Sequence, residues 1–162
     1  MELKIDTHPL ITVLELFHDE MKKEFENNCR HGLYGNYSMI YDLFNNDHAI
    51  DCLKDGKPIG FTTWNRWEPK VVTIDFMWLL PSERSFFTAK KFIELVSKEF
   101  KRRRDKILRS KCITLNGLCI AEHSGFIIED GSPSYNEFKE RYPWEKGSLM
   151  FGRAIPTFKL LQ

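Results

Sequence analysis

Two side chains in this sequence suit proton transfer. Asp75 is the only carboxylate in the apolar segment Val71–Leu80, and a charged group among apolar residues is costly unless it is paired or hydrated. We therefore expect Asp75 either to face a polar cleft as a base or to hydrogen-bond a neighbouring strand or loop. His123 precedes Ser124-Gly125, and histidine is the side chain that changes charge near neutral pH. Its alternative role is that of a solvated residue on a short surface helix.

Other reactive or bulky side chains give weaker signals. Trp64 and Trp78 stand on or beside segments with strand spacing, where they would either wall a substrate pocket or pack in the core. Cys119 has no base partner that the sequence identifies, so a nucleophilic cysteine is not expected. The cysteines show neither a CxxC pair nor zinc-ligand spacing, which predicts no metal site; they are Cys29, Cys52, Cys112 and Cys119.

The composition is that of a folded protein. The 162 residues are 42% hydrophobic and 14% aromatic, with a net charge of +1, which excludes a disordered chain and a strong overall attraction to polyanions. The length fits one domain spanning 1–162. The start, MELKIDTHPL, lacks the features of a signal peptide, and no apolar run approaches the length of a membrane span. We therefore expect a cytoplasmic protein that does not bind membranes.

One segment is strongly basic. Lys98–Lys111 holds eight basic residues against Glu99 and Asp105. Such a run is found in surfaces that bind nucleic acid, but cations at the end of a helix also complement its dipole. No RNA-stacking or helix-turn-helix signature accompanies the run, so nucleic acid is not the expected partner, and nucleic-acid binding through this segment is the weaker alternative function.

The first half of the chain predicts helices followed by strands. A short strand is expected over 2–5, and the spacing of Leu10, Leu14, Phe17 and Met21 predicts an amphipathic helix. A second short helix is expected over 38–43. Hydrophobic alternation and two short turns then predict an antiparallel meander of three strands over 48–53, 59–64 and 71–80.

The second half predicts a long helix over 86–104, a strand over 111–115, a short helix over 118–124 and strands over 126–129 and 148–155. A polar loop is expected over 130–143. The whole chain is thus predicted to be an α/β (α+β) protein. Its order is strand, two helices, three strands, helix, strand, helix and two strands, in a mixed, mostly antiparallel sheet of about six or seven strands.

This order resembles the GNAT superfamily of acyl-coenzyme A-dependent N-acyltransferases over nearly the whole chain. The hairpin Asp55–Phe61 looks like the turn between the second and third strands of that family. Trp78–Pro81 followed by Arg84 looks like the entry to its cofactor loop, written Arg/Gln-x-x-Gly-x-Gly/Ala. The resemblance implies acetyl-coenzyme A as the acyl donor.

The resemblance also implies which residues hold the donor. Arg84 matches the motif arginine, and Leu79 and Leu80 would offer backbone groups to the pantetheine arm. Asn116 stands near the family's asparagine, two residues too close to Gly125. The backbone amides expected at the pyrophosphate, at a helix N-terminus, are those of Ser85, Phe86, Phe87, Thr88, Ala89 and Lys90.

The chain departs from the pattern of the family at two positions, one in the cofactor loop and one in the short helix predicted over 118–124. Phe87 stands where the first motif glycine allows backbone to approach phosphate, and a ring that points outward would fill the pyrophosphate site. Ala121 stands where relatives have the tyrosine that protonates the leaving thiolate. Tyr135 and Tyr142, in the predicted polar loop, either replace that tyrosine or pack as ordinary loop aromatics.

Two functions follow from the resemblance. The first is an N-acyltransferase in which Asp75, or a water that it orders, deprotonates an amine acceptor and His123 lies near the thioester. The acceptor would be a small amine, a peptide N-terminus, a lysine or an aminoacyl group, and the protein a monomer or homodimer. The second is a non-catalytic GNAT-like module that binds or supports a partner and has lost acetyl-coenzyme A, as Phe87 and Ala121 suggest. Degenerate loops of this kind are familiar in family members carried by phages and mobile elements.

Overall fold

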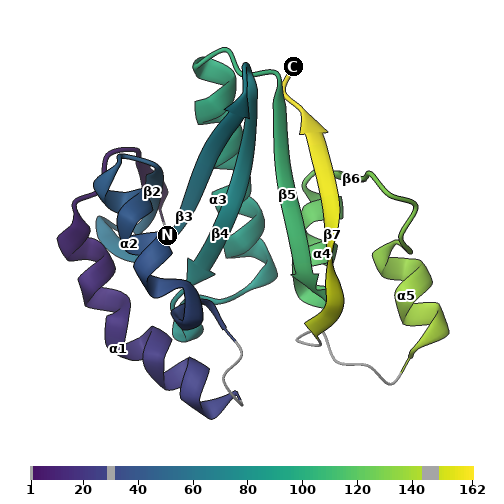
Figure 1. The fold of residues 1–162 in the computed structure, drawn as a ribbon, viewed down its shortest axis with the longest axis horizontal. Helices are drawn as coiled ribbons and strands as arrows, with labels where there is room; N and C mark the ends of the chain where they lie inside the picture. Colours follow the sequence, from purple (N-terminus) through teal and green to yellow (C-terminus); the bar gives the residue numbers. More distant parts are fainter. Residues whose placement is uncertain (1, 29–31, 144–149) are drawn as a thin grey trace. The chain divides into compact units, whose positions relative to one another are not determined.

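The computed structural model describes residues 2–28, 32–143 and 150–162 (Figure 1). It divides into two compact units, one formed by Met1–Asn65 and Ile74–Thr88 and the other by Arg66–Thr73 and Ala89–Gln162. The prediction of one domain over 1–162 stays a prediction. Among the described residues, no helix is long and apolar enough to cross a membrane.

The first unit contains the antiparallel strands β1 (Leu3–Asp6), β2 (Ala49–Lys54) and β3 (Lys57–Glu68). The hairpin between β2 and β3 turns at Asp55 and Gly56, whose φ angles are 50° and 82°. Two central residues with positive φ match the right-handed twist of the strands, which explains the Asp-Gly pair at this turn.

Helices α1 (Ile11–Asn27) and α2 (Tyr37–Asn45) supply the apolar core of the first unit. The predicted stripe on α1 is largely confirmed, because Leu14, Phe17 and Met21 are buried, whereas Leu10 precedes the helix and is 72% exposed. These side chains pack in one cluster with buried residues of α2, β2, β3 and β4, namely Ile40, Phe44, Ala49, Phe61 and Trp78.

Strand β4 (Val71–Leu79) approaches β3 closely at Gly60. A Cβ on Gly60 would lie 2.3 Å from the carbonyl oxygen of Trp78, so only glycine fits there. The Leu80 N–H donates to the Ile59 carbonyl at 2.8 Å. After β4 the short 3-10 helix η2 (Pro81–Glu83) leads to α3 (Phe86–Arg102), whose first three residues belong to the first unit.

The second unit contains most of α3, followed by β5 (Ile107–Thr114), α4 (Leu115–His123), β6 (Ile127–Ile128), α5 (Tyr135–Arg141) and β7 (Met150–Leu160). Strand β7 pairs antiparallel with both β5 and β6, as Figure 1 shows for the pair of β5 and β7. The apolar face predicted for α3 is confirmed, since Phe92, Val96 and Phe100 are buried.

Over the described residues the sheet has seven strands in the order β1-β2-β3-β4-β5-β7-β6, and apart from the additional helix α5 the chain order of helices and strands follows the prediction. The predicted α/β class with a mostly antiparallel sheet is therefore confirmed. Several predicted bounds differ. The polar loop over 130–143 contains α5, and β5 begins at Ile107 instead of at 111. Strand β3 continues to Glu68 instead of ending at 64, and β7 continues to Leu160 instead of ending at 155. The start predicted for the last strand, 148–149, lies outside the described residues.

Candidate functional site

Asp75 lies on β4 in a polar network within the first unit. Its Oδ2 accepts a hydrogen bond from Asn65 Nδ2 at 2.5 Å, and Asn65 Oδ1 lies 3.1 Å from His48 Nδ1. The His48 ring stacks on Trp64, with ring centroids 4.4 Å apart and planes 10° from parallel. Asp75 thus has a hydrogen bond to a neighbouring strand, which was the alternative to its facing a polar cleft. Its role as a base stays a prediction.

The backbone at the end of β4 already has internal partners. The Leu79 carbonyl accepts from Arg84 Nε at 2.9 Å, and the Leu80 N–H donates to the Ile59 carbonyl at 2.8 Å. The predicted contacts with pantetheine would therefore compete with bonds inside the protein at these two groups.

Arg84 is held by an acidic residue of α1. Its guanidinium forms an ion pair with the Glu24 carboxylate, with Nη2 at 2.9 Å from Oε1, and lies 5.8 Å from the centroid of the Trp78 ring. Trp78 Nε1 donates to the same carboxylate at 3.1 Å. Trp78 itself is buried in the core cluster of the first unit. The sequence does not identify Glu24 as the partner of Arg84 and Trp78, because Glu24 stands among other charged residues of α1.

The start of α3 is capped by Ser85. Ser85 Oγ accepts from the Thr88 N–H at 3.0 Å, and its hydroxyl donates to Thr88 Oγ1 at 2.9 Å. The first turn of any helix presents N–H groups with no intrahelical partner at the positive end of the dipole. Phe86 and Phe87 are 46% and 67% exposed, so the ring of Phe87 points to solvent and not into the core.

The remaining predicted residues belong to the second unit. Ala89 is buried and Lys90 half-buried on α3, while Asn116 and His123 are exposed on α4. His123 Nδ1 lies 2.8 Å from the Cys119 carbonyl and 3.7 Å from Cys119 Sγ. Burial, and secondarily Glu122, raises the pKa of the Cys119 thiol, which keeps it protonated.

The two tyrosines considered as replacements lie at either end of α5. Tyr135 begins that helix, and its N–H donates to Glu122 Oε2 at 3.0 Å. Tyr142 follows the helix, is 42% exposed and contacts the Phe138 ring. No cluster of His, Cys, Asp or Glu suited to a metal ion occurs in the described part of the chain.

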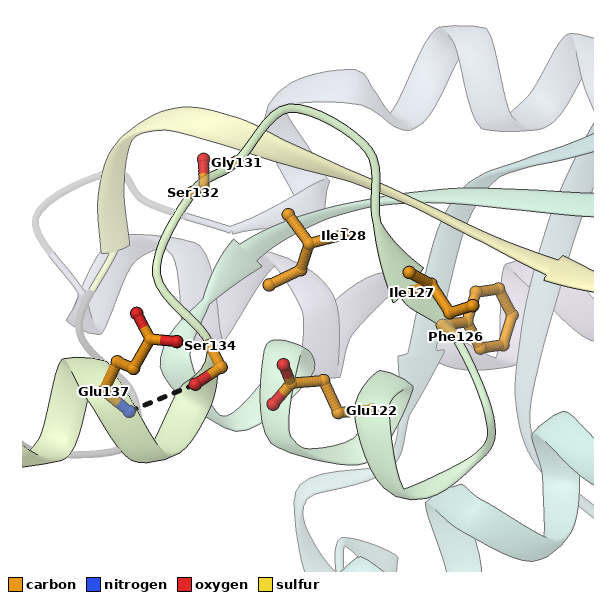
Figure 2. A pocket seen from close by; sticks show the side chains of 8 residues that line it. All are labelled: Glu122, Phe126, Ile127, Ile128, Gly131, Ser132, Ser134 and Glu137. Atoms are coloured by element: carbon orange, nitrogen blue, oxygen red, sulfur yellow. Dashed lines mark hydrogen bonds between the residues drawn. The ribbon is translucent and has the colours of Figure 1, made fainter.

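A groove of about 500 Å³ lies on the second unit between α4 and the segment that leads into α5 (Figure 2). Within it, Ser134 Oγ caps α5 by accepting from the Glu137 N–H at 3.2 Å. The residues predicted for the site do not line this groove, which is lined by Glu122, Phe126, Ile127, Ile128, Gly131, Ser132, Ser134 and Glu137.

Among the described residues, three basic residues of the segment Lys98–Lys111 have acidic partners inside the second unit, namely Arg102, Arg103 and Arg109. Glu99 pairs with Arg102 and Arg103, and its pKa is lowered chiefly by the hydrogen bond from Arg102. Asp105, an acid of the segment, binds Arg66 from outside the segment at 2.7 and 2.9 Å and so neutralises none of its bases. Arg109 lies 3.2 Å from Glu129. These pairs lower the positive field that a nucleic acid would meet.

Comparison with solved structures relates this arrangement to N-acetyltransferases. PaiA N-acetyltransferase from Thermoplasma acidophilum, solved with coenzyme A, matches over 99% of both chains at 16% identity and a TM-score of 0.69. Aminoglycoside 6'-acetyltransferase type Ii matches over 100% of this chain and 98% of its own at 13% identity and 0.68. A GNAT-family acetyltransferase from Staphylococcus aureus Mu50 matches over 99% and 100% at 12% identity and 0.66.

Sequence comparison adds no relative. No protein-family model matches the chain, and no curated protein matches its sequence significantly. Identities of this size relate backbones and not active sites, so substrate and activity do not follow from them. The likeness nevertheless extends over whole chains and agrees with the order of elements described above. The chain has the fold of the GNAT N-acetyltransferases.

Proposed function

We propose that this protein transfers an acyl group, with acetyl as the expected one, from coenzyme A to a primary amine. The fold carries the proposal, because structures that match it along the whole chain are N-acetyltransferases and one of them was solved with coenzyme A. Acyl transfer to an amine needs mainly positioning and a base for the ammonium proton. The first unit offers both a helix N-terminus and a polar network on β4.

The segment Arg84–Thr88 would hold the pyrophosphate. Ser85 caps one N–H of the first turn of α3, and the other amides of this turn, with the helix dipole, suit an anion. Arg84 would add a cation once its guanidinium turns from Glu24. Leu79, Leu80, Ala89, Lys90, Asn116 and His123 stay predicted contacts of the donor or the acyl group.

A second candidate function is a non-catalytic module with the same fold. The outward ring of Phe87, 67% exposed beside the proposed pyrophosphate site, favours it. So does Ala121, which is buried in α4 and offers no hydroxyl to a leaving thiolate. This alternative predicts a folded protein with no affinity for coenzyme A.

Thermal unfolding with and without coenzyme A separates the two functions. Ligand at about 100 times its Kd stabilises a protein by roughly 2.7 kcal/mol, which raises the Tm of a domain of this size by about 5 °C. We expect this shift for the wild type, a smaller one for Arg84→Ala, and an unchanged one for the matched control Lys101→Ala, an exposed basic residue later on α3. No shift with any variant would favour the non-catalytic module.

The acceptor is tested by release of the coenzyme A thiol with a panel of primary amines. Similar folds include an aminoglycoside acetyltransferase, an N-acetylglutamate synthase and a ribosomal-protein-alanine N-acetyltransferase. The panel therefore contains kanamycin, glutamate, a peptide with N-terminal alanine, a lysine peptide and spermidine. Transfer to at least one of them is the expected outcome, and binding of coenzyme A without transfer to any would contradict the enzymatic role.

A further inference from the structure

Three polar side chains from separate segments of the first unit form one chain of hydrogen bonds. His48 immediately precedes β2, Asn65 lies on β3 and Asp75 on β4. His48 Nδ1 lies 3.1 Å from Asn65 Oδ1, and Asn65 Nδ2 lies 2.5 Å from Asp75 Oδ2. All three side chains are half-buried, so the network is shielded yet not closed to solvent.

The chemistry of the groups fixes the direction of every bond in this network. A carboxylate only accepts, so Asp75 requires the amide nitrogen of Asn65 to face it. The amide oxygen of Asn65 then faces His48 and also only accepts. The imidazole must therefore donate from Nδ1, and in the neutral ring the lone pair resides on Nε2.

The ring of His48 is also held in position before any substrate binds. It stacks on Trp64, which is 5% exposed. Its backbone is fixed on both sides, since the His48 N–H donates to the Leu43 carbonyl at 2.8 Å and its carbonyl accepts from the Trp64 N–H at 3.0 Å. In the described part of the chain, the one hydrogen bond recorded for the ring uses Nδ1. The ring of this half-buried residue therefore has a fixed tautomer and an orienting partner, the arrangement that is typical of a general base.

We propose that His48 is the catalytic base of the transfer reaction and that Asn65 and Asp75 are positioning residues that act through it. The proposal rests on the proposed function. Asp75, expected from the sequence to be a base itself, here orients Asn65. Protonation of Nε2 leaves the Nδ1–H bond to Asn65 intact, so the network holds the ring in both charge states.

His48 Nε2 takes one proton from the ammonium group of the acceptor, and the imidazole becomes an imidazolium. The amine nitrogen then attacks the thioester carbonyl carbon, so a C–N bond forms and the C–S bond breaks. The electron pair leaves with the coenzyme A thiolate, which takes up the second amine proton directly or through water. His48 returns its proton to solvent.

The tautomer of His48 is tested first, because it requires no acceptor. In ¹⁵N-labelled protein, at a pH where the ring is neutral, the side-chain signals of His48, assigned by their loss in His48→Gln, should show the ring proton on Nδ1. Asn65→Leu removes the acceptor and should shift the ring toward protonation at Nε2. A wild-type ring protonated at Nε2 would overturn the proposal.

Two substitutions, assayed for transfer to an amine from the panel, then test whether His48 or Asp75 is the base. His48→Ala should lower kcat about 100-fold, a typical contribution of general-base catalysis, while the KM for acetyl-coenzyme A stays unchanged. Added imidazole should restore part of the rate, which a merely structural residue would not allow. Asp75→Asn keeps an oxygen that accepts from Asn65, so kcat should fall only a few-fold.

The opposite pattern refutes the proposal. In that case kcat would fall strongly in Asp75→Asn and little in His48→Ala, and imidazole would not restore the rate. His8→Ala is the matched control, since Nδ1 of His8 also has a hydrogen-bonding partner, Asp47, but on the surface, and this variant should keep full activity. His48→Gln guards against misfolding of the alanine variant. If the wild type transfers the acyl group and His48→Ala does so at the same rate, this inference alone is overturned. A wild type that neither binds coenzyme A nor transfers an acyl group overturns the proposed function and this role with it.

Discussion

At the level of single residues, Arg84 has two competing anionic partners. The structure pairs its guanidinium with Glu24, and the proposed function assigns it to the pyrophosphate of coenzyme A. The Arg84 side chain is 42% exposed, so the pair with Glu24 is screened by water and contributes at most about 1 kcal/mol. A bound phosphate group, with more charge and more acceptor oxygens, would outcompete it.

Glu24→Gln should therefore strengthen the binding of coenzyme A about threefold, because the release of a weak ion pair corresponds to roughly 0.7 kcal/mol. Glutamine retains an oxygen that accepts from Trp78 Nε1, so the packing of the tryptophan is kept. The measurement is the Kd by titration calorimetry. Glu20→Gln, on an exposed residue of the same helix, is the control, and weaker binding by Glu24→Gln alone would mean that Glu24 positions Arg84 for the ligand.

The sequence identifies Asp75 and Arg84 because each stands out from its own segment, one by its apolar neighbours and one by its motif. Their partners could not be identified in the same way. Glu24 is 60 residues from Arg84, and His48 is 17 residues from Asn65. Only the tertiary fold brings these pairs together, and nothing in the local spacing distinguishes Glu24 or His48 from other polar residues nearby.

At the level of elements, the N-terminus of α3 can be tested for stability and for anion binding separately. Ser85→Ala removes the cap on the Thr88 N–H and should lower the free energy of unfolding by about 1 kcal/mol. Ser85→Asp keeps a capping oxygen and should keep the stability, but its negative charge would repel a pyrophosphate. We expect the aspartate variant to unfold like the wild type in urea and to lose its thermal shift with coenzyme A.

The two variants are matched controls for each other. Should Ser85→Asp bind coenzyme A as the wild type does, the pyrophosphate does not lie at this helix end. A loss of stability in both variants would instead show that the hydrogen bond to Thr88 Oγ1, which the aspartate cannot donate, matters as much as the cap.

Periodicity predicted the helices and strands that bury a continuous apolar face. Three consecutive meander strands and the stripes of α1 and α3 were identified for this reason. Helix α5 was not identified, because its seven residues form no buried stripe and its start depends on the Ser134 cap. The start of β5 was placed too late, because Ser110 stands between the buried Leu108 and Cys112 on the same face of the strand and interrupts the apolar alternation.

For the whole molecule, one buried carboxylate makes stability depend on pH. Asp51 lies on β2 opposite Phe61 and is 1% exposed, and among the described residues neither of its oxygens has a hydrogen-bond partner. Burial, and secondarily Asp6, raises its pKa from 3.8 to about 8. The folded state therefore keeps this proton over a pH range in which the unfolded chain has released it.

The free energy of unfolding should fall as the pH rises from about 4 to about 8, because over this range the folded protein still holds a proton that the unfolded chain has released. Above about pH 8 both states have lost the proton, so the free energy of unfolding should level off. Asp51→Asn removes the titration, keeps the shape, and should be more stable than the wild type at pH 8 by roughly 2 kcal/mol or more, each pKa unit corresponding to about 1.4 kcal/mol. Urea unfolding at pH 5, 6.5 and 8 measures both effects. Asp19→Asn, on an exposed residue of α1, should keep the wild-type slope. If Asp51→Asn keeps that slope as well, the carboxyl of Asp51 is ionised in the folded protein and its charge is compensated by water or by a rearrangement of β1 and β2.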